Sequence, residues 1–325
     1  MFGGGRSITM YFNNGVNRNV SVRKTVFPNP KDIQLRVAAI GDIHLSRLVG
    51  MNDVIQILEL LKEVKSDYIC LLGDLIDSPT VLYDSRKVDE LLYLVEECSK
   101  IAPTMIVLGN HDFINQEILG FPSVLKDMSI WNELDSIKDV HFLNNTTYTD
   151  GNVFFGGYLQ PRESYFVEGE KYQRDAGPLY DDLKKQRVLL NDLPSDMVKI
   201  LLTHSLEYLG DTRIKELLVP AYNLVLGGHD HNGCVPTLID GFWPGNGGII
   251  SPKKQLFPKQ VRGIVKADSC LYYVYSGGWS KITACAPSAL QFLNFFCDPQ
   301  IDIIDFIPGG QYQTENKRYV LRKHW

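Results

Sequence analysis

The sequence predicts an α/β protein in which helices cover a parallel or mixed β-sheet, and three observations support this fold class. Short apolar runs recur along the first half of the chain, and each ends in Gly-Asp or Gly-Asn. The stretches between these runs carry apolar residues at helical spacing. The 325 residues are 44% hydrophobic, which is enough to bury a core of this kind.

The expected elements begin with a hairpin and continue as a βαβαβ unit. Two strands are predicted over residues 7–12 and 16–27, on either side of the turn signal Asn13-Asn14-Gly15. The strands that follow are Arg36–Ile40, Tyr68–Leu72 and Met105–Leu108, with helices over Val54–Val64 and Val88–Cys98 between them. Because parallel strands need crossover connections, this order predicts parallel neighbours covered by helices.

The second half repeats the pattern less regularly. Its expected elements are the strands Val153–Gly157, Lys199–Thr203, Leu224–Leu226, Leu271–Ser276 and Ile301–Ile307 and the helix Tyr180–Leu190. No repeat, low-complexity segment or linker divides the chain. We therefore expect a single domain over 1–325, built on two sheets. It comprises an N-terminal hairpin (1–34), a region with the motifs described below (35–235), and a loop with C-terminal strands (236–325).

Charge and composition exclude several classes of protein. The formal net charge of −5 predicts no bulk attraction to nucleic acid or to anionic membranes. No run approaches the 18 apolar residues of a membrane span, and the N-terminus lacks the apolar run of a signal peptide. The six cysteines form no CxxC pair, which favours reduced thiols and a cytoplasmic location.

Five of the seven histidines lie in short motifs at the ends of the apolar runs or just past them. The motifs are Gly41-Asp42-Ile43-His44, Gly73-Asp74-Leu75-Ile76-Asp77, Gly109-Asn110-His111-Asp112, Thr203-His204 and Gly228-His229-Asp230-His231. Because ligands bind beyond the carboxyl ends of strands in such sheets, we expect the motifs to meet. One Gly-Asp is usually only a turn, but five such motifs in order predict a metal site. His141 is expected to be a packed strand residue, and His324 a solvated one.

The donor types indicate which metals the site would bind. Carboxylate and amide oxygens with imidazoles, and no cysteine, suit Mn, Fe, Zn, Ni or Mg and disfavour a thiolate zinc site. In Asp42-x-His44 and His229-x-His231, residues two apart on an extended segment point the same way. The carboxylate of Asp74 can bridge two ions, and two ions about 3.5–4 Å apart suit an in-line displacement.

The order of these motifs resembles the signature of the calcineurin-like metallophosphoesterases. The later stretch, with Gly277-Gly278 and Cys297-Asp298-Pro299, is similar to the bacterial YkuE-type branch of that superfamily. The resemblance implies a four-layer α/β/β/α sandwich with two mixed β-sheets. It also implies two divalent metal ions, with manganese as the first candidate. The implied reaction is hydrolysis of phosphate mono- or diesters through a metal-bound hydroxide.

The resemblance also implies roles for individual residues. One ion would be held by Asp42, His44, Asp74 and His231, and the other by Asp74, Asn110, His204 and His229. His111 would protonate the leaving oxygen or stabilise charge in the transition state, and the carboxylate of Asp77 would orient it. A helix N-cap is the alternative role for Asp77. Asp230 adds a negative charge that either strengthens metal binding or disfavours highly anionic substrates.

The residues near the bridging aspartate narrow the substrate class. Ser78-Pro79 follows Asp77 where related protein phosphatases carry an arginine, which disfavours phosphoprotein substrates. Leu75 and Ile76 stand where purple acid phosphatases need a tyrosine. A lipid-linked or nucleotide phosphoester remains the expected substrate, with no other nucleic-acid binding. The alternative function is a non-catalytic binding scaffold of the same fold.

A loop after the last histidine motif is both apolar and basic. It contains Phe242, Trp243, Ile249, Ile250, Leu256 and Phe257 together with Lys253, Lys254, Lys259 and Arg262. Such a loop either contacts a lipid-linked substrate or an anionic bilayer, or packs over the sheet with its lysines in solvent. The first alternative predicts peripheral membrane contact. The basic run Lys317–His324 near the C-terminus is either a solvated tail or a contact surface, and we expect the tail.

Overall fold

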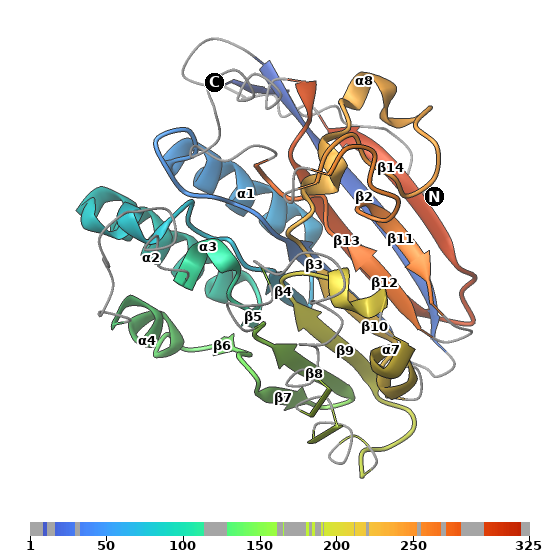
Figure 1. Ribbon diagram of the computed structural model, residues 1–325. Coiled ribbons are helices and arrows are strands. Elements are labelled where there is room, and N and C mark those ends of the chain that lie inside the picture. The colour runs from blue at the N-terminus through green and yellow to red at the C-terminus, as the bar shows by residue number, and fades with distance from the viewer. Residues whose placement is uncertain are drawn as a thin grey trace.

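The computed structural model describes most of the chain. The described residues are 9–11, 17–29, 33–113, 129–160, 165, 180–181, 184–185, 190, 192–210, 212–218, 221–251, 255–267, 271–280 and 296–319. They form two mixed β-sheets that pack face to face, with helices on both outer surfaces (Figure 1). The predicted fold class and the α/β/β/α layering are confirmed.

The first sheet joins the N-terminal, central and C-terminal parts of the chain. Its strand order is β1-β2-β13-β3-β4-β5-β6, and β14 also pairs with β2. The strands are β1 Thr9–Tyr11, β2 Asn17–Asn29, β13 Gln300–Pro308, β3 Leu35–Ile40, β4 Tyr68–Leu71, β5 Thr104–Ile106, β6 Val140–Phe142 and β14 Gln313–Tyr319. Strands β3 to β6 run parallel, so their carboxyl ends lie along one edge.

The second sheet has the order β11-β12-β10-β9-β8-β7. Its strands are β11 Gly263–Lys266, β12 Tyr272–Tyr275, β10 Leu224–Gly227, β9 Val198–Thr203, β8 Val153–Tyr158 and β7 Thr147–Asp150. The four central strands are parallel, and the two edge strands pair antiparallel.

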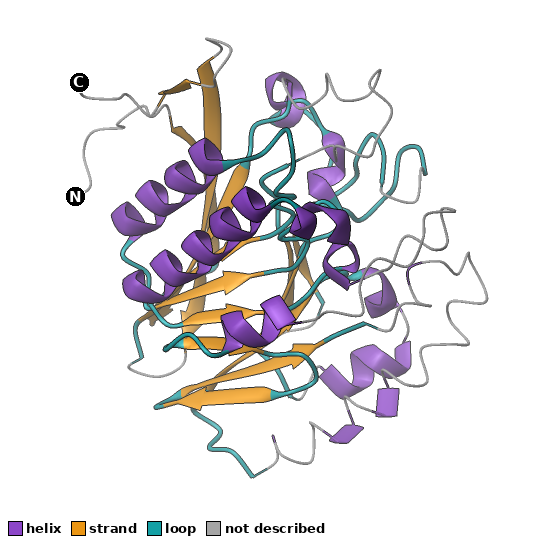
Figure 2. Cartoon of the chain, turned by 90° about the vertical axis from the view of Figure 1, so that its left-hand side faces the viewer, coloured by secondary structure: helices purple, strands orange, loops and turns teal. Residues whose placement is uncertain are grey.

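Side chains alternate between the two faces of each strand, and this alternation builds three hydrophobic cores. In β3, Ala38 and Ile40 face helices α1 (Met51–Val64) and α2 (Ser85–Ile101), which cover the first sheet (Figure 2). Val37 and Ala39 belong to the core between the sheets. The outer face of the second sheet packs on α7 (Thr212–Leu218). The remaining short elements are η1 Pro79–Tyr83, α3 Asn110–Phe113, α4 Ser129–Asp135, η4 Glu207–Gly210, η5 His231–Cys234 and α8 Thr237–Asp240.

The predicted strands that carry the motifs are confirmed to within two residues at each end. The hairpin pairing of β1 with β2 is present, but its turn at residues 13–15 lies outside the described residues. The helix expected over Tyr180–Leu190 is described only in part, and His324 is not described. His141 lies on β6 and stacks on Tyr148, as expected of a packed strand residue.

The prediction for the basic run near the C-terminus was wrong for its first three residues. Residues 317–319 belong to β14, which pairs with β2, whereas residues 320–324 lie outside the described residues. The polar sequence of β14 gives no apolar alternation, because this strand lies at the surface and pairs through its main chain. None of the described helices is long and apolar enough to cross a bilayer. Cys70 and Cys98 are buried free thiols, and the reduced state of all six cysteines stays a prediction.

Candidate metal centre

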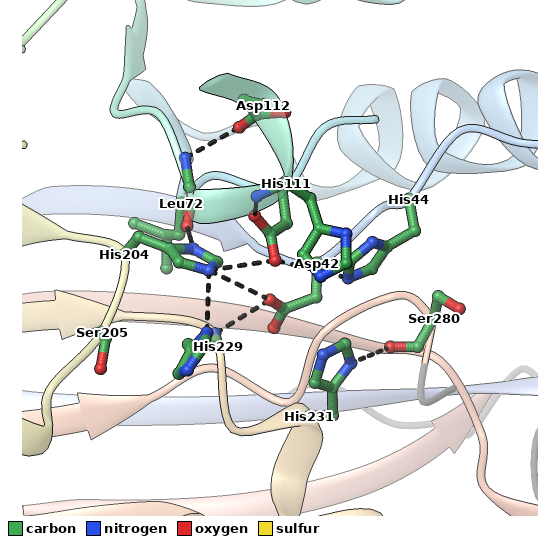
Figure 3. Close-up of polar contacts among 12 residues, drawn as sticks. Asp42, His44, Leu72, His111, Asp112, His204, Ser205, His229, His231 and Ser280 are labelled. Carbon is green, nitrogen blue, oxygen red and sulfur yellow. Dashed lines mark hydrogen bonds and ion pairs between the residues drawn. The ribbon is translucent and has the colours of Figure 1, made fainter. Parts of the chain in front are cut away.

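The five histidine motifs meet where the carboxyl ends of the two sheets come together. Asp42 and His44 follow β3, Asp74 follows β4, and His204 follows β9. His229 and His231 follow β10. Asn110 and His111 open α3, directly after β5. Figure 3 shows the rings of His44, His111, His204, His229 and His231 gathered around Asp42.

Five of these residues adopt a backbone conformation that side chains other than glycine rarely take. The φ angles are positive at Asp42 (51°), His44 (53°), Asp74 (51°), His229 (70°) and His231 (48°). Each such residue costs about 1–3 kcal/mol, so the conformation persists only where the surroundings enforce it. Main-chain hydrogen bonds help to hold this conformation. Asp42 N donates to Gly73 O (3.0 Å), and His44 N donates to Asp74 O (2.9 Å). Strain concentrated at one point indicates a functional site.

Three overlapping groups of donor atoms could each hold a cation. They are Asp42/His44/His231, His44/Asp74/His111 and Asp74/His204/His229, and within each group the donor atoms lie within 4.8 Å of one another. The middle group shares His44 with the first and Asp74 with the third. The first and third groups share no residue, so the three groups together offer donors for two neighbouring ion positions.

Several of these donor atoms are buried and make no hydrogen bond to another described residue. They are Asp42 Oδ2, both ring nitrogens of His44, and Asn110 Oδ1. A buried polar atom left without a partner costs about 1–3 kcal/mol. A divalent cation would satisfy all of these atoms, and the oxygen and imidazole donors fit Mn, Fe, Zn, Ni or Mg. The residues present therefore fit a metal centre.

Main-chain carbonyl groups orient two of the histidines. Nδ1 of His204 donates to the carbonyl oxygen of Leu72 (2.7 Å), and Nδ1 of His231 donates to that of Ser280 (2.7 Å). Because a carbonyl oxygen only accepts, each hydrogen bond places a proton on Nδ1 and directs Nε2 toward the centre, where it can bind a metal ion in the neutral form of the ring. Nε2 of His204 lies 3.1 Å from Asp74 Oδ2.

The electrostatic field at the centre stabilises positive charge. Burial alone would raise the pKa of Asp74, but the neighbouring His204 and His111 outweigh burial and hold this pKa well below its usual range. Burial would lower the pKa of His204, yet Asp74 raises it to about 10. By contrast, burial lowers the pKa of His44 and His229, which are therefore neutral imidazoles with a lone pair to offer. Asp74 and the surrounding imidazoles therefore stabilise a positive charge between them, either a proton or a metal ion.

Asp77 contacts His111 through its main chain. His111 Nδ1 donates to the main-chain oxygen of Asp77 (2.5 Å), and the Asp77 carboxylate lies 3.5 Å from Nδ1 of His44. That the carboxylate orients His111 stays a prediction. The N-cap of the following η1 is Ser78, so the alternative role for Asp77 does not hold for that element. Burial opposes protonation of His111, but Asp74 and the Asp77 carbonyl outweigh it and raise the pKa.

Two residues that the motif pattern did not assign support the centre. Asp112 is buried and accepts hydrogen bonds from the main-chain nitrogens of Gly109 (2.8 Å) and Ile76 (3.1 Å). It thereby ties the loop after β4 to the loop after β5, and burial raises its pKa to about 7. The ring of Tyr165 meets the ring of His229 edge-on, with 5.4 Å between ring centroids.

The loop after β12 closes the other side of the centre. The main-chain nitrogens of Trp279 and Ser280 donate to the carbonyl oxygens of Gly41 (2.9 Å) and Asp42 (2.8 Å). Gly278 has a φ of +68°, and a Cβ atom there would lie 2.8 Å from Asp42 Oδ2. Only glycine therefore lets this loop approach the carboxylate without displacing it.

The family model described as calcineurin-like phosphoesterase matches residues 35–233, a range that contains all five motifs and more than half of the chain. The chain belongs to this family. The same range holds the strands β3 to β5 and β8 to β10, which present the motifs.

Comparisons with single proteins give more distant similarities. The chain is 28% identical over 99 residues to a transmembrane protein with metallophosphoesterase domain from Danio rerio, covering 30% of this chain and 21% of that protein. It is 21% identical over 224 residues to an uncharacterized metallophosphoesterase from Helicobacter pylori (strain J99), covering 68% of this chain and 51% of that protein. The chain thus spans about a fifth and about half of the lengths of these two curated relatives.

Two solved structures are also similar. One is a dimetal phosphatase from Danio rerio, with 12% identity, a TM-score of 0.42, and coverage of 75% of this chain and 87% of that one. The other is GAP50, the anchor in the inner membrane complex of Plasmodium, with 14% identity, a TM-score of 0.46, and coverage of 89% and 90%.

A Gly278→Ala variant tests whether the loop after β12 positions Asp42. We expect the affinity for Mn²⁺ to fall about 10- to 100-fold, as for other groups that support metal ligands. The matched control is Gly309→Ala, where φ is +63° but no atom lies within 4 Å of the added Cβ. Both variants should lose about 1–2 kcal/mol of unfolding free energy from backbone strain. Equal Mn²⁺ affinities for the two variants, measured by calorimetry, would contradict the assigned role.

Proposed function

We propose that this protein hydrolyses phosphate mono- or diesters with the help of two divalent cations, with manganese as the first candidate. The observation that carries the proposal is the overlap of the donor groups around His44 and Asp74, which offers two adjacent ion positions. Asp42, His44, Asp74 and His231 would hold one ion. Asp74, Asn110, His204 and His229 would hold the other.

The bound ions would supply a water of lowered pKa and neutralise charge on the phosphoryl oxygens. The chain itself supplies a proton donor. His111 has a raised pKa, and its Nδ1–H is occupied by the Asp77 carbonyl. Its Nε2–H would be the proton given to the leaving oxygen.

The scaffold alternative is less well supported, because the described residues include every predicted metal donor and His111. A scaffold has no need to keep strained donors that lack partners. The substrate we favour is a lipid-linked or nucleotide phosphoester, and membership of the YkuE-type branch stays a prediction.

A His111→Ala variant separates enzyme from scaffold. With p-nitrophenyl phosphate or its bis ester and Mn²⁺, we expect turnover to fall about 10²- to 10⁴-fold, the usual contribution of a general acid. The bound metal should remain, since His111 is not one of the proposed ligands. The matched control is His141→Ala, which removes a histidine stacked on Tyr148 away from the centre. Unchanged turnover in His111→Ala would refute the assigned role.

We further propose that the protein works at an anionic bilayer. The docking surface, which we term the α8 lobe, is the described part of residues 237–262. Its side chains Leu238 (83% exposed), Phe242 (91%), Leu256 (66%) and Phe257 (66%) project into solvent. Trp243, Ile249 and Ile250 are only half-buried. The alternative that the loop packs over the sheet therefore accounts only for these half-buried residues and not for the exposed ones.

Charge in the same segment supports a bilayer over an apolar protein partner. Residues 237–262 contain Lys253, Lys254, Lys259 and Arg262 and a single acidic residue, Asp240, in a chain of net charge −5. Lys253 and Lys254 lie outside the described residues. Exposed aromatic and aliphatic side chains interleaved with lysine suit the interface of an anionic membrane. Within the lobe, Arg262 forms an ion pair with Asp240 at the end of α8 (2.7 Å).

Vesicle cosedimentation at low salt tests this surface. We expect binding to vesicles that contain phosphatidylglycerol and not to pure phosphatidylcholine. The double variant Phe242→Ser/Phe257→Ser should bind at least about tenfold more weakly, since each buried ring contributes about 1.5–3 kcal/mol. The control Tyr83→Ser removes an exposed ring (67%) outside the lobe and should bind normally. Equal binding by all three proteins, or none by the unmodified chain, would rule the surface out.

A further inference from the structure

A cavity lies beside the loop that carries His229 and His231. Its volume is about 430 Å³, within the range of small-molecule sites. Its described walls come from the segment after β9, from α7, from Ser251 and residues 255–261, and from β11 and β12 with the residue after β11. None of the predicted metal ligands is among its described lining residues. The cavity is therefore distinct from the metal centre, although Asp230 connects the two.

Two hydroxyl groups in this cavity are unpartnered. Ser251 and Tyr273 are both buried, and neither Ser251 Oγ nor the Tyr273 hydroxyl has a hydrogen-bond partner among the described residues. Both residues line the cavity. Buried polar groups are normally hydrogen-bonded, so two exceptions in one cavity call for a partner that occupies it.

Asp230 contributes a carboxylate to the same cavity. It is fully buried between the two histidines of its motif, and it belongs to none of the three metal-binding groups. The tyrosine Tyr275, which also lines the cavity, has a pKa raised by burial and by the charge of Asp230. From the sequence, Asp230 either strengthens metal binding or disfavours highly anionic substrates. Its place among the lining residues adds a third role, in this cavity.

The chemistry of the walls selects a ligand class. A ligand hydroxyl can donate to the carboxylate of Asp230 and accept from Ser251 or Tyr273. The described lining residues also include three exposed lysines, Lys215, Lys259 and Lys266. The acidic lining residues are two, Asp230 and Glu207. The cavity thus combines hydroxyl recognition with attraction for an anion.

We propose that this cavity binds a phosphorylated polyol, with its hydroxyl groups on Asp230, Ser251 and Tyr273 and its phosphate on the lysines. The inference is independent of the proposed hydrolysis, because it uses no residue of the metal centre. The volume accommodates one sugar phosphate.

Calorimetry on the Mn²⁺-loaded full chain tests the proposal. The probe is the phosphonate analogue of glucose 6-phosphate, which has no ester bond to hydrolyse, and its affinity is compared with those of glucose and inorganic phosphate. We expect Tyr273→Phe and Ser251→Ala each to weaken probe binding about three- to tenfold, the effect of one hydrogen bond. Tyr83→Phe, which removes an exposed hydroxyl, should bind the probe normally.

Two further readouts separate recognition from a structural role and from the metal centre. Removing an unpartnered hydroxyl should leave the melting temperature of Tyr273→Phe and Ser251→Ala unchanged or raised. Asp42→Asn, which alters the metal centre, should keep probe affinity. The proposal is overturned if the probe does not bind, or if inorganic phosphate binds as tightly. It is equally overturned if Asp42→Asn abolishes binding while the two hydroxyl variants retain it.

Discussion

The buried carboxylate of Asp74 is the group on which the arrangement of the centre depends. It sits at a positive φ just past β4, accepts a hydrogen bond from the main-chain nitrogen of His111 (2.8 Å), and lies 3.1 Å from His204. One side chain thus links the first sheet to the second. A buried carboxylate among imidazoles is stable only with a compensating positive charge, and the lowered pKa of Asp74 reflects that need.

The two sheets matter because neither could build this centre alone. The first sheet presents Asp42, His44, Asp74 and Asn110, and the second presents His204, His229 and His231. Their packing through a shared apolar core brings both sets of strand ends together. The loop after β12 then closes on Asp42 and holds His231 through Ser280. A rigid scaffold with strained donors suits a site that must hold ions at fixed separation.

Much of this could be predicted from the sequence, because strand-end motifs are local patterns. Apolar runs ending in Gly-Asp placed Asp42 and Asp74 correctly, and helical spacing located α1 and α2. Contacts between distant segments could not be predicted. Nothing in the sequence near Ser280 signals its hydrogen bond to His231, 49 residues away, and the pairing of polar β14 with β2 leaves no periodic trace. The hydrogen bond from His111 to the Asp77 carbonyl could not be predicted for a related reason. Every residue has a main-chain carbonyl, so the residue type does not indicate which one accepts.

The most direct test of the account is the number of metal ions bound per chain after reconstitution with Mn²⁺, measured by mass spectrometry. The proteins to compare are the unmodified chain, Asp74→Asn and the control Asp139→Asn, which alters an exposed residue. The proposed centre, in which two ion positions share the Asp74 carboxylate, predicts two ions in the unmodified chain and in Asp139→Asn. They predict fewer than two in Asp74→Asn. One ion or none in the unmodified chain, or two ions retained in Asp74→Asn, would contradict the shared-carboxylate centre.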